Sequence, residues 1–312
     1  MERRGSEHAT PVHSSHMQTT TFKTTTEIEL KAGIYGADAS SSTPKPVILW
    51  IHGGALIMGT RAKIAPGQLE RYLDAGFVVV SIDYRLAPET KLPAIAEDVE
   101  DAISWIRGAG AEEFGWDSDR LGVVGHSAGG YLTLLTGHRA NPAPKALVAF
   151  YGYGNIAGDW YSKPDPFYST EFEMFTEEQA HAAVGNGEIA DGSIDPRRRD
   201  YYLWCRQNGL WPEKVGGHDP VAELDWFAPY SPADNVDSNY PPTLLLHGNA
   251  DTDVPYEQSV HMAQRLASAG VEHTFTTIES GPHGFDNNPE TATTPAVVAA
   301  IDSAVEFLTK HV

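Results

Sequence analysis

Short uninterrupted runs of apolar residues recur along the chain and indicate buried β-strands. These runs lie at residues 47–51, 77–82, 121–124, 146–150 and 243–246. Several are rich in Val and Ile, and strands that are covered by helices on both faces have this continuous apolar composition. A last strand is expected at residues 274–278. The pattern therefore predicts the interior strands of a sheet that is buried on both sides.

Between these runs, apolar residues fall three or four positions apart, which is the spacing of an amphipathic helix. Ile95, Val99 and Ile103, for example, form one apolar stripe among Asp and Glu residues. The same kind of pattern predicts helices at residues 67–75, 94–107, 128–138, 257–269 and 295–310. Strands and helices that alternate in this way predict an α/β fold with a mostly parallel sheet and helices on both faces.

The N-terminal end of the chain departs from this alternation. Residues 1–20 are rich in His, Ser and Thr and show no periodicity, so we expect a mobile N-terminal tail. Residues 21–35 alternate polar residues with Ile28, Leu30 and Ile34, which predicts an exposed antiparallel strand at the start of the sheet. The α/β core is then expected to comprise residues 21–154 and 241–312.

Residues 155–240 interrupt the alternation a second time. This segment holds 14 of the 31 aromatic residues, and its 16 acidic and six basic residues give a net charge of −10, half of the chain's −20. We expect a cap inserted between two core strands, whose aromatic side chains help to form a substrate pocket. The candidate pocket residues are Trp160, Phe172, Phe175, Trp204, Trp211 and Trp226, although most aromatic residues of such a segment are expected to form its own small core.

The overall composition narrows the possible partners. Hydrophobic residues make up 41% and charged residues 21% of the chain, as in globular proteins. A net charge of −20 repels phosphate backbones and anionic lipid headgroups, so neither nucleic acid nor a membrane surface is an expected partner. The chain has no apolar run of the roughly 20 residues that a membrane span needs and no apolar stretch typical of a secretory signal near its start. A cytoplasmic location is therefore expected.

A serine flanked by small residues directly follows one predicted strand. Residues 125–129, GHSAG, match the Gly-x-Ser-x-Gly turn, in which a strained serine between a strand and a helix stands clear of the sheet. A serine hydroxyl is a weak nucleophile, so it needs a nearby base and donors for the developing oxyanion. Ser127 is therefore predicted as a nucleophile, and an ordinary serine turn or helix cap is the alternative.

A glycine-rich stretch supplies candidate oxyanion donors. Residues 52–55, HGGA, follow the strand at 47–51 and are close to the His-Gly-Gly-Gly type of oxyanion loop. We expect hydrogen bonds from the backbone N–H groups of Gly54, Ala55 and Ala128, the last because it follows the nucleophile. His52 is expected to brace the loop. The alternative is a glycine-rich turn without a function.

Two acids compete for the role of orienting the base histidine. Both belong to residues 247–255, HGNADTDVP, just past a predicted strand end. A base histidine needs a carboxylate that fixes its tautomer and stabilises its protonated form. Asp251 is predicted in this role, and Asp253 is expected to be a turn or cap residue.

His283 is the predicted base among 13 histidines. It lies in GPHGF, residues 281–285, between the last predicted strand and the C-terminal helix, and it completes the chain order Ser, Asp, His. His126, His247 and His261 lie on or beside core elements and are expected to be structural.

Taken together, these motifs resemble those of the α/β-hydrolase fold. The chain is similar to hormone-sensitive-lipase-like carboxylesterases of the esterase and lipase group. The similarity lies in the predicted Ser, Asp and His residues, in HGGA and in DYRLAPE at residues 83–89. The resemblance covers about residues 46–152 and 241–312. DYRLAPE and Asp98 are expected to support the oxyanion loop structurally. Ala55 stands where the family motif has a third glycine, and the insertion at 155–240 is expected to replace the family's N-terminal cap.

The expected function is that of a serine carboxylic-ester hydrolase acting on small neutral esters through an acyl-enzyme, without a metal or organic cofactor. An acidic cap over the site is expected to repel charged esters; the alternative is that its acidic residues only solvate the outer surface of the cap and do not face the entrance. Arylformamidase, other amidase or peptidase activity on the same triad is an alternative, as is a non-catalytic ligand receptor of this fold. Expected partners are a small-molecule ester and, as an open alternative, further copies of the chain, with no stable membrane association.

Overall fold

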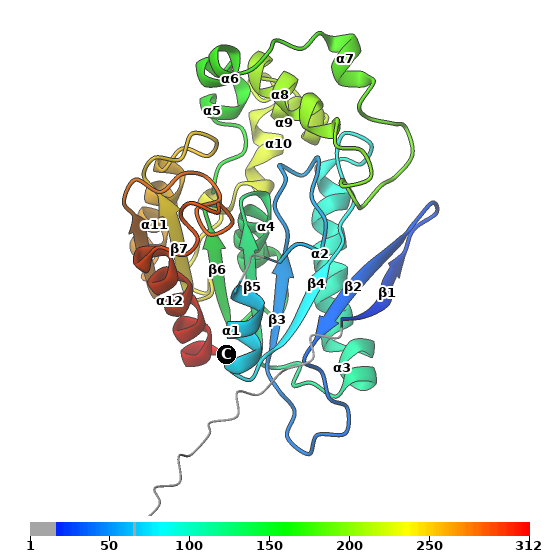
Figure 1. Cartoon of the computed structure of the whole chain (residues 1–312), viewed down its shortest axis with the longest axis vertical. Coiled ribbons are helices and arrows are strands. Elements are labelled where there is room, and N and C mark those ends of the chain that lie inside the picture. Colours follow the sequence, from blue (N-terminus) through cyan, green and yellow to red (C-terminus); the bar gives the residue numbers. More distant parts are fainter. Residues whose placement is uncertain (1–16, 65–66) are drawn as a thin grey trace, which may run out of the picture.

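Eight strands form one sheet through the middle of the computed structural model, which describes residues 17–64 and 67–312 (Figure 1). Their order across the sheet is β1-β2-β4-β3-β5-β6-β7-β8. β2 pairs antiparallel with both β1 and β4, and every other neighbouring pair is parallel. The strands are β1 Gln18–Thr24, β2 Glu29–Tyr35, β3 Val47–Ile51, β4 Val78–Ile82, β5 Leu121–His126, β6 Ala146–Phe150, β7 Thr243–Gly248 and β8 His273–Ile278.

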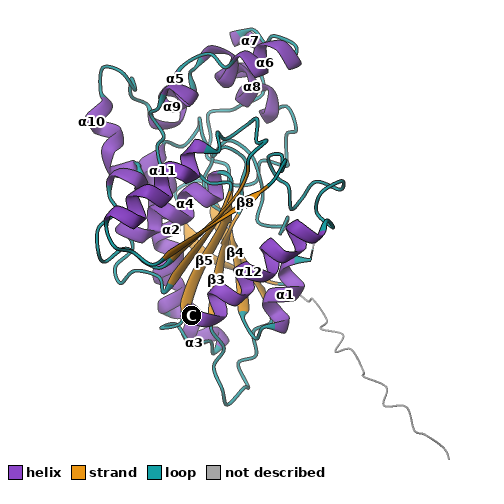
Figure 2. Ribbon diagram, turned by 90° about the vertical axis from the view of Figure 1, so that its left-hand side faces the viewer, coloured by secondary structure: helices purple, strands orange, loops and turns teal. Residues whose placement is uncertain are grey.

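Helices cover both faces of this sheet (Figure 2). α1 Gln68–Asp74 and α12 Pro295–His311 pack on one face, and α2 Leu92–Arg107, α4 Ala128–Arg139 and α11 Glu257–Ser268 pack on the other; α3 Ala109–Phe114 follows α2. Side chains of a strand alternate between the two faces, so Ile48 joins the core under α1 and α12 while Leu49 joins the opposite core. The predicted α/β fold with a mostly parallel sheet is confirmed. No helix in the described part of the chain is long and apolar enough to cross a membrane.

The N-terminal edge of the sheet differs from the sequence-based expectation. The single strand expected at residues 21–35 is a hairpin of β1 and β2. Its turn is closed by the Thr25 hydroxyl, which accepts hydrogen bonds from the backbone N–H groups of Glu27 and Ile28. Residues 18–20, expected in the tail, belong to β1 and pair with β2. Residues 1–16 of the expected tail lie outside the described residues.

The inserted segment, residues 155–240, runs between β6 and β7 (Figure 1). Its residues up to 217 lie over the carboxyl ends of the parallel strands, and residues 232–234 pack against α4 and α11 on one face of the sheet. Buried Arg198 fixes the segment to the core: Nε donates to the carbonyl of Ile57 at 2.6 Å, and the guanidinium pairs with Glu89 at 2.7 Å. The segment contains α5 Asp159–Ser162, α6 Pro166–Glu171, α7 Glu177–His181, α8 Arg198–Asn208, α9 Trp211–Gly216, α10 Leu224–Phe227 and the 3₁₀ helices Ala228–Tyr230 and Pro232–Asp234.

Candidate active site

The three residues predicted as nucleophile, acid and base meet at the carboxyl edge of the sheet. Ser127 lies between β5 and α4, Asp251 follows β7, and His283 follows β8. The Ser127 hydroxyl faces His283 Nε2 at 3.1 Å, and His283 Nδ1 lies 2.7 Å from Asp251 Oδ2. Nδ1–H can therefore donate to the carboxylate while Nε2 accepts the hydroxyl proton, which is the arrangement that activates a serine.

A strained turn positions Ser127. Its φ of 54° and ψ of −119° lie in a sparsely populated backbone region, and such strain is concentrated at functional sites. The turn packs against the end of β3 so closely that a Cβ on Gly129 would lie 2.1 Å from the carbonyl oxygen of Ile51. Only glycine fits at that position. The last residue of the Gly-x-Ser-x-Gly motif is thus required by backbone packing, and the packing leaves the serine hydroxyl in the cavity.

Asp251 is held as a carboxylate by four hydrogen bonds. Oδ1 accepts the backbone N–H groups of Asp253 and Val254 at 2.8 and 2.9 Å, and Oδ2 accepts from His283 and, at 3.2 Å, from His247 Nε2. Burial alone would raise the pKa of Asp251, but the hydrogen bonds from the two histidines outweigh it and hold this pKa well below its usual range. Asp251 is therefore ionised at neutral pH.

His247 and Tyr151 support the site from below, and neither was a sequence-based candidate for this role. The other nitrogen of His247 lies 2.7 Å from the hydroxyl of Ser259, so the imidazole is fixed at both ends. The Tyr151 ring packs edge-on against the His283 ring, with centroids 4.7 Å apart, and its hydroxyl donates to buried Asp286 at 2.6 Å. Their positions in the sequence could have indicated this role, because both residues lie at the carboxyl ends of parallel strands.

The interpretation of Asp253 as a turn or cap residue is wrong. Asp251 itself accepts the turn N–H groups, and the Asp253 side chain lines the cavity instead. Its Oδ2 lies 3.3 Å from Nε2 of His283, on the side of the ring that faces Ser127. Two carboxylates of one loop therefore face the two nitrogens of the same imidazole.

The HGGA loop runs beside the nucleophile. A Cβ on Gly53 would lie 3.2 Å from the Ser127 Cβ, which shows how closely the two backbones approach. Gly54 and Ala55 line the cavity, and their φ angles are 117° and 57°. Ala128 begins α4, so its N–H has no acceptor in the preceding turn of that helix, although its side chain is buried away from the cavity. All three predicted donors thus lie around Ser127.

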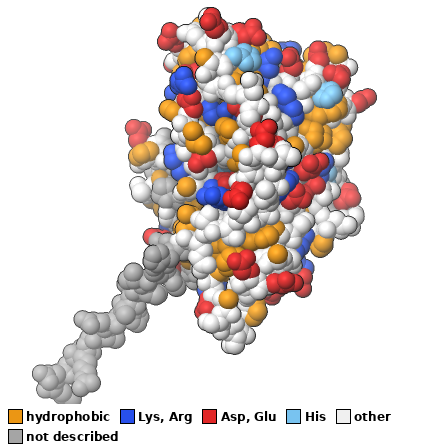
Figure 3. All heavy atoms as spheres, turned by 90° about the vertical axis from the view of Figure 1, so that its right-hand side faces the viewer, with side chains coloured by type: hydrophobic (Ala, Val, Ile, Leu, Met, Phe, Trp, Pro, Cys, Tyr) orange, Lys and Arg blue, Asp and Glu red, His pale blue; other side chains and the backbone are white. Residues whose placement is uncertain are grey.

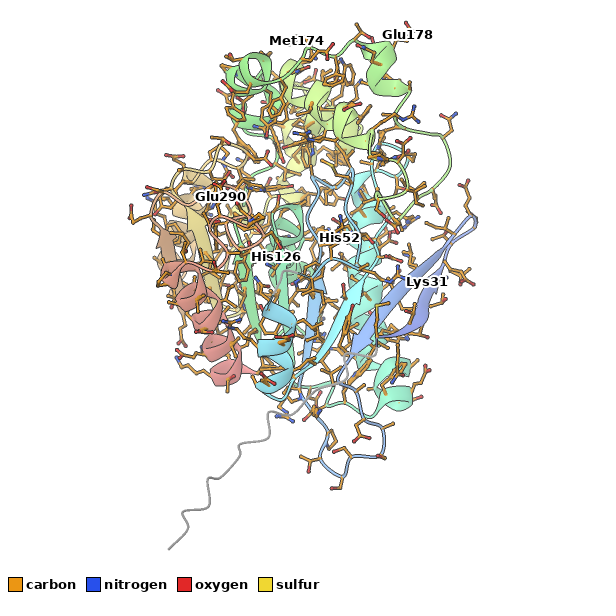
Figure 4. The ribbon with its side chains drawn as sticks, viewed as in Figure 1. Lys31, His52, His126, Met174, Glu178 and Glu290 are labelled. Carbon is orange, nitrogen blue, oxygen red and sulfur yellow. The ribbon has the colours of Figure 1, made fainter. Side chains whose placement is uncertain are left out.

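Residues 83–89 brace this loop, as the sequence predicts. The Tyr84 hydroxyl donates to the carbonyl of His52 at 2.9 Å, and the two rings stack 4.2 Å apart. Ala87 N–H donates to the carbonyl of Leu56 at 2.7 Å. Arg85 pairs with Asp98 of α2 at 2.7 Å. Figure 4 shows His52 above β3, beneath the inserted segment, with His126 near it at the end of β5.

The inserted segment also braces the HGGA loop, through Trp211, whose Nε1–H donates to the carbonyl of Ala55 at 2.9 Å. Trp211→Phe removes this hydrogen bond, so we expect kcat to fall about tenfold with little change in KM, because a small displacement of catalytic groups is costly. Trp226→Phe, elsewhere in the segment, is the control. Steady-state kinetics with melting curves tests this; equal kcat values for the two variants would contradict it.

The triad opens into a cavity of about 330 Å³. The loop of Gly54, Ala55 and Met58 forms one wall, and Tyr202 of α8 closes it from the inserted segment. None of the six aromatic residues named as candidates lines this cavity, so the alternative, that they form the core of the segment, describes them better. Trp204 and Trp211 are buried within the segment's own core, where large apolar side chains stabilise it.

A metal site is not formed by the described residues, among which no three His, Cys, Asp or Glu side chains cluster suitably. Cys205, the single cysteine, is buried on α8, and burial raises the pKa of its thiol.

Comparison with known proteins agrees with this geometry. A family described as alpha/beta hydrolase fold matches residues 48–287. A non-reducing polyketide synthase of Penicillium brevicompactum is 30% identical over 339 residues, covering 95% of this chain and 16% of the synthase. Esterase LipC of Mycobacterium tuberculosis is 30% identical over 247 residues, covering 78% of this chain and 54% of LipC. The chain thus spans only part of the length of these relatives.

Among solved structures, a thermophilic esterase of Thermogutta terrifontis with bound propionate superposes with a TM-score of 0.67 and 21% identity. The superposition covers 96% of both chains and shows a shared fold. Because the family match spans 240 residues, from 48 to 287, and includes Ser127, Asp251 and His283, the protein belongs to the alpha/beta hydrolase fold family.

Proposed function

We propose that the protein is a serine carboxylic-ester hydrolase that acts on small neutral esters through an acyl-enzyme. The observation that carries this proposal is the alignment of Ser127 Oγ, His283 and Asp251, with contacts of 3.1 and 2.7 Å at the two ring nitrogens. The esterase relatives support the same reaction class. A receptor without catalysis would have no need for a strained serine beside a base and a buried carboxylate.

In the proposed mechanism, His283 Nε2 takes the proton of Ser127 as the hydroxyl oxygen attacks the acyl carbon. Asp251 keeps Nδ1–H oriented and stabilises the imidazolium. The N–H groups of Gly54, Ala55 and Ala128 donate to the oxyanion of the tetrahedral intermediate. The alkoxide leaves with the Nε2 proton, and a water molecule then repeats the sequence on the acyl-enzyme, releasing the acid and the serine.

The size and lining of the cavity support a small substrate. A volume of about 330 Å³ lies at the lower end of the range of ligand pockets. Most of the cavity wall is apolar, because it is lined by glycines, Ala55, Met58 and the Trp50 ring. A second hollow of about 410 Å³ adjoins it across residues 54–63 and offers room for the distal part of a longer ester. Neutral esters with short to medium acyl chains fit these dimensions.

The polyketide synthase relatives favour a second acyl donor. The segment of the synthase that resembles this chain covers 95% of it. Because the triad attacks the acyl carbon whichever heteroatom leaves, a polyketide acyl group on an oxygen or sulfur leaving group is a second candidate substrate.

A panel of nitrophenyl esters from acetate to laurate, with a hemisuccinate as the singly anionic analogue, tests the substrate class. We expect the highest kcat/KM for short to medium neutral acyl chains. The neutral-to-anionic ratio should shrink as salt rises, because charges more than about 10 Å apart are screened at 0.1 M ionic strength. Acidic and basic side chains are interspersed over the inserted segment in the face that Figure 3 shows, so the salt effect should be modest. A preference for the anionic or the longest ester would contradict the proposal.

A further inference from the structure

The second carboxylate at the base histidine is the starting point. Asp253 Oδ2 lies 3.3 Å from Nε2 of His283, and Asp251 Oδ2 lies 2.7 Å from Nδ1. Both acids belong to the loop between β7 and α11. Within the described residues, His283 is the only partner of this Asp253 oxygen. The base thus lies between two carboxylates rather than one.

The inserted segment fixes the orientation of Asp253. Oδ1 accepts hydrogen bonds from the Tyr168 hydroxyl at 2.5 Å, from Arg206 at 2.9 Å and from the Tyr202 hydroxyl. Arg206 also donates to the backbone carbonyl of Asp253 at 2.9 Å and pairs with Asp165 at 2.6 Å. With one oxygen saturated by three donors, the carboxylate cannot turn away, and the other oxygen is directed at His283.

The Arg206 anchor is itself rigid. Its side chain on α8 is 1% exposed and lies against the faces of aromatic rings, with distances of 4.5 Å to Tyr168 and 4.9 Å to Tyr161. A buried guanidinium with fixed partners gives up little conformational freedom when it holds a carboxylate. The position of Asp253 relative to the base is therefore set by the inserted segment and not by its own loop alone.

The two carboxylates match one protonation state of the imidazole. In neutral His283, Nδ1–H donates to Asp251 and Nε2 presents a lone pair, which the Asp253 carboxylate would face unfavourably. In the imidazolium, Nδ1–H donates to Asp251 and Nε2–H faces Ser127 Oγ. The Asp253 carboxylate, 3.3 Å from Nε2, attracts the positive charge of the ring as an ion pair without a hydrogen bond. The same imidazolium forms whenever Ser127 or a water molecule gives up its proton during catalysis.

We propose that Asp253, held by Arg206, is a positioning residue that acts through His283: it favours the imidazolium, stabilising the charge that forms in the transition states while requiring a higher pH for the free base. This inference rests on the proposed function, because the stabilised charge is that of the esterase reaction. Through Arg206 and Asp253, the inserted segment would then affect the protonation of the base histidine, in addition to closing the cavity.

The other groups around His283 do not replace Asp253 in this role. Asp286, on the same loop, is occupied by the Gln68 amide at 2.8 Å and the Tyr151 hydroxyl at 2.6 Å. The remaining titratable or charged groups that face the ring or its cavity are His52 after β3, His126 beside Ser127, Tyr151 at the end of β6, Tyr202 on α8, Lys63 across the cavity and Asp251. Asp253 is therefore the only carboxylate that approaches Nε2 among the described residues.

The sign of the pH effect follows from these contacts. Burial alone lowers the pKa of His283, and the charges of Asp253 and Asp251 outweigh it and raise this pKa above its ordinary value. Since kcat/KM of an esterase with a histidine base rises as the free imidazole loses its proton, removing the Asp253 charge should lower the midpoint of that rise. An opposite charge at this distance shifts a pKa by about one unit.

The decisive comparison is Asp253→Asn against Asp165→Asn. Both carboxylates pair with Arg206, and their side chains are exposed to 23% and 22%, so each variant loses one charge from the same arginine. Only Asp253 approaches His283. We expect the kcat/KM midpoint to fall by about one pH unit in Asp253→Asn and to stay at the wild-type value in Asp165→Asn. Below its midpoint, Asp253→Asn should have a higher kcat/KM than the wild type, and at high pH a lower one. The two pH profiles of kcat/KM should therefore cross.

Two further measurements keep the test decisive. A ¹⁵N NMR titration of the His283 ring, assigned with His283→Gln, measures the same midpoints without turnover, and Asp253→Ser substitutes for the asparagine variant if that variant does not fold. Equal His283 midpoints in wild type and Asp253 variants would overturn the inference, as would equal shifts in both Asn variants. Absence of ester hydrolysis by the wild type would instead overturn the proposed function.

Discussion

Replacement of Ser127 by alanine is expected to lower kcat by about six orders of magnitude, because members of a catalytic triad act as a unit. The hydroxyl contacts the base at 3.1 Å and is the group that forms the acyl-enzyme. Its loss removes a hydrogen bond but no packing, so the melting temperature should stay within a few degrees of that of the wild type. Steady-state hydrolysis of nitrophenyl butyrate, with melting curves, measures both quantities.

Ser231→Ala is a matched control, since Ser231 is also buried and hydrogen-bonded, to the carbonyl of Phe227 at 3.2 Å, but lies outside the cavity. It should keep wild-type turnover. His283→Ala should be about as inactive as Ser127→Ala, and the double variant should lose little more. If the loss of kcat in the double variant equalled the product of the two single losses, the two residues would not act together.

Asp251→Asn is expected to lower kcat by about four orders of magnitude. An amide nitrogen in place of Oδ2 would face the N–H groups of His283 and His247, which lie 2.7 and 3.2 Å from it. To relieve this, His283 would take the tautomer with its proton on Nε2, which can no longer accept the serine proton. Single-turnover acylation at high pH, where the base is free, isolates this effect from protonation.

Asp253→Asn provides the comparison, because it removes the other carboxylate of the same loop. At high pH it should be slower than wild type but lose far less turnover than Asp251→Asn, since the Nδ1 partner and the tautomer of His283 are preserved. If Asp253→Asn proved the more damaging of the two substitutions at high pH, Asp251 would not be the residue that orients the base.

Interior strands and their helices were predictable from the sequence because burial on both faces removes polar residues from them. β3 and β6 span the same residues as the apolar runs at 47–51 and 146–150. The edge hairpin was not predictable in the same way. Its turn is made by a threonine hydroxyl at Thr25, without glycine, proline or asparagine, so the alternation of polar and apolar residues seemed to continue through it.

The meeting of Ser127, Asp251 and His283 was predictable because each lies in the loop that follows a strand of the parallel sheet, and the carboxyl ends of such strands share one edge. The surroundings of the triad were not. Asp251 and Asp253 are two residues apart, and their different orientations depend on Arg206, which lies 47 residues earlier in the chain. Likewise, aromatic content indicated a cap but not which face of α8 reaches the cavity, so Tyr202 was missed while buried Trp204 was named.

Covalent labelling with a fluorophosphonate, followed by intact-protein and peptide mass spectrometry, tests the central role of Ser127 most directly. An activated serine attacks phosphorus and displaces fluoride, so the adduct marks the nucleophile. The proposed mechanism predicts a single adduct per chain, on Ser127, that forms in step with the loss of ester hydrolysis and is absent from Ser127→Ala. An adduct on another residue, or hydrolysis that persists after complete labelling of Ser127, would contradict it.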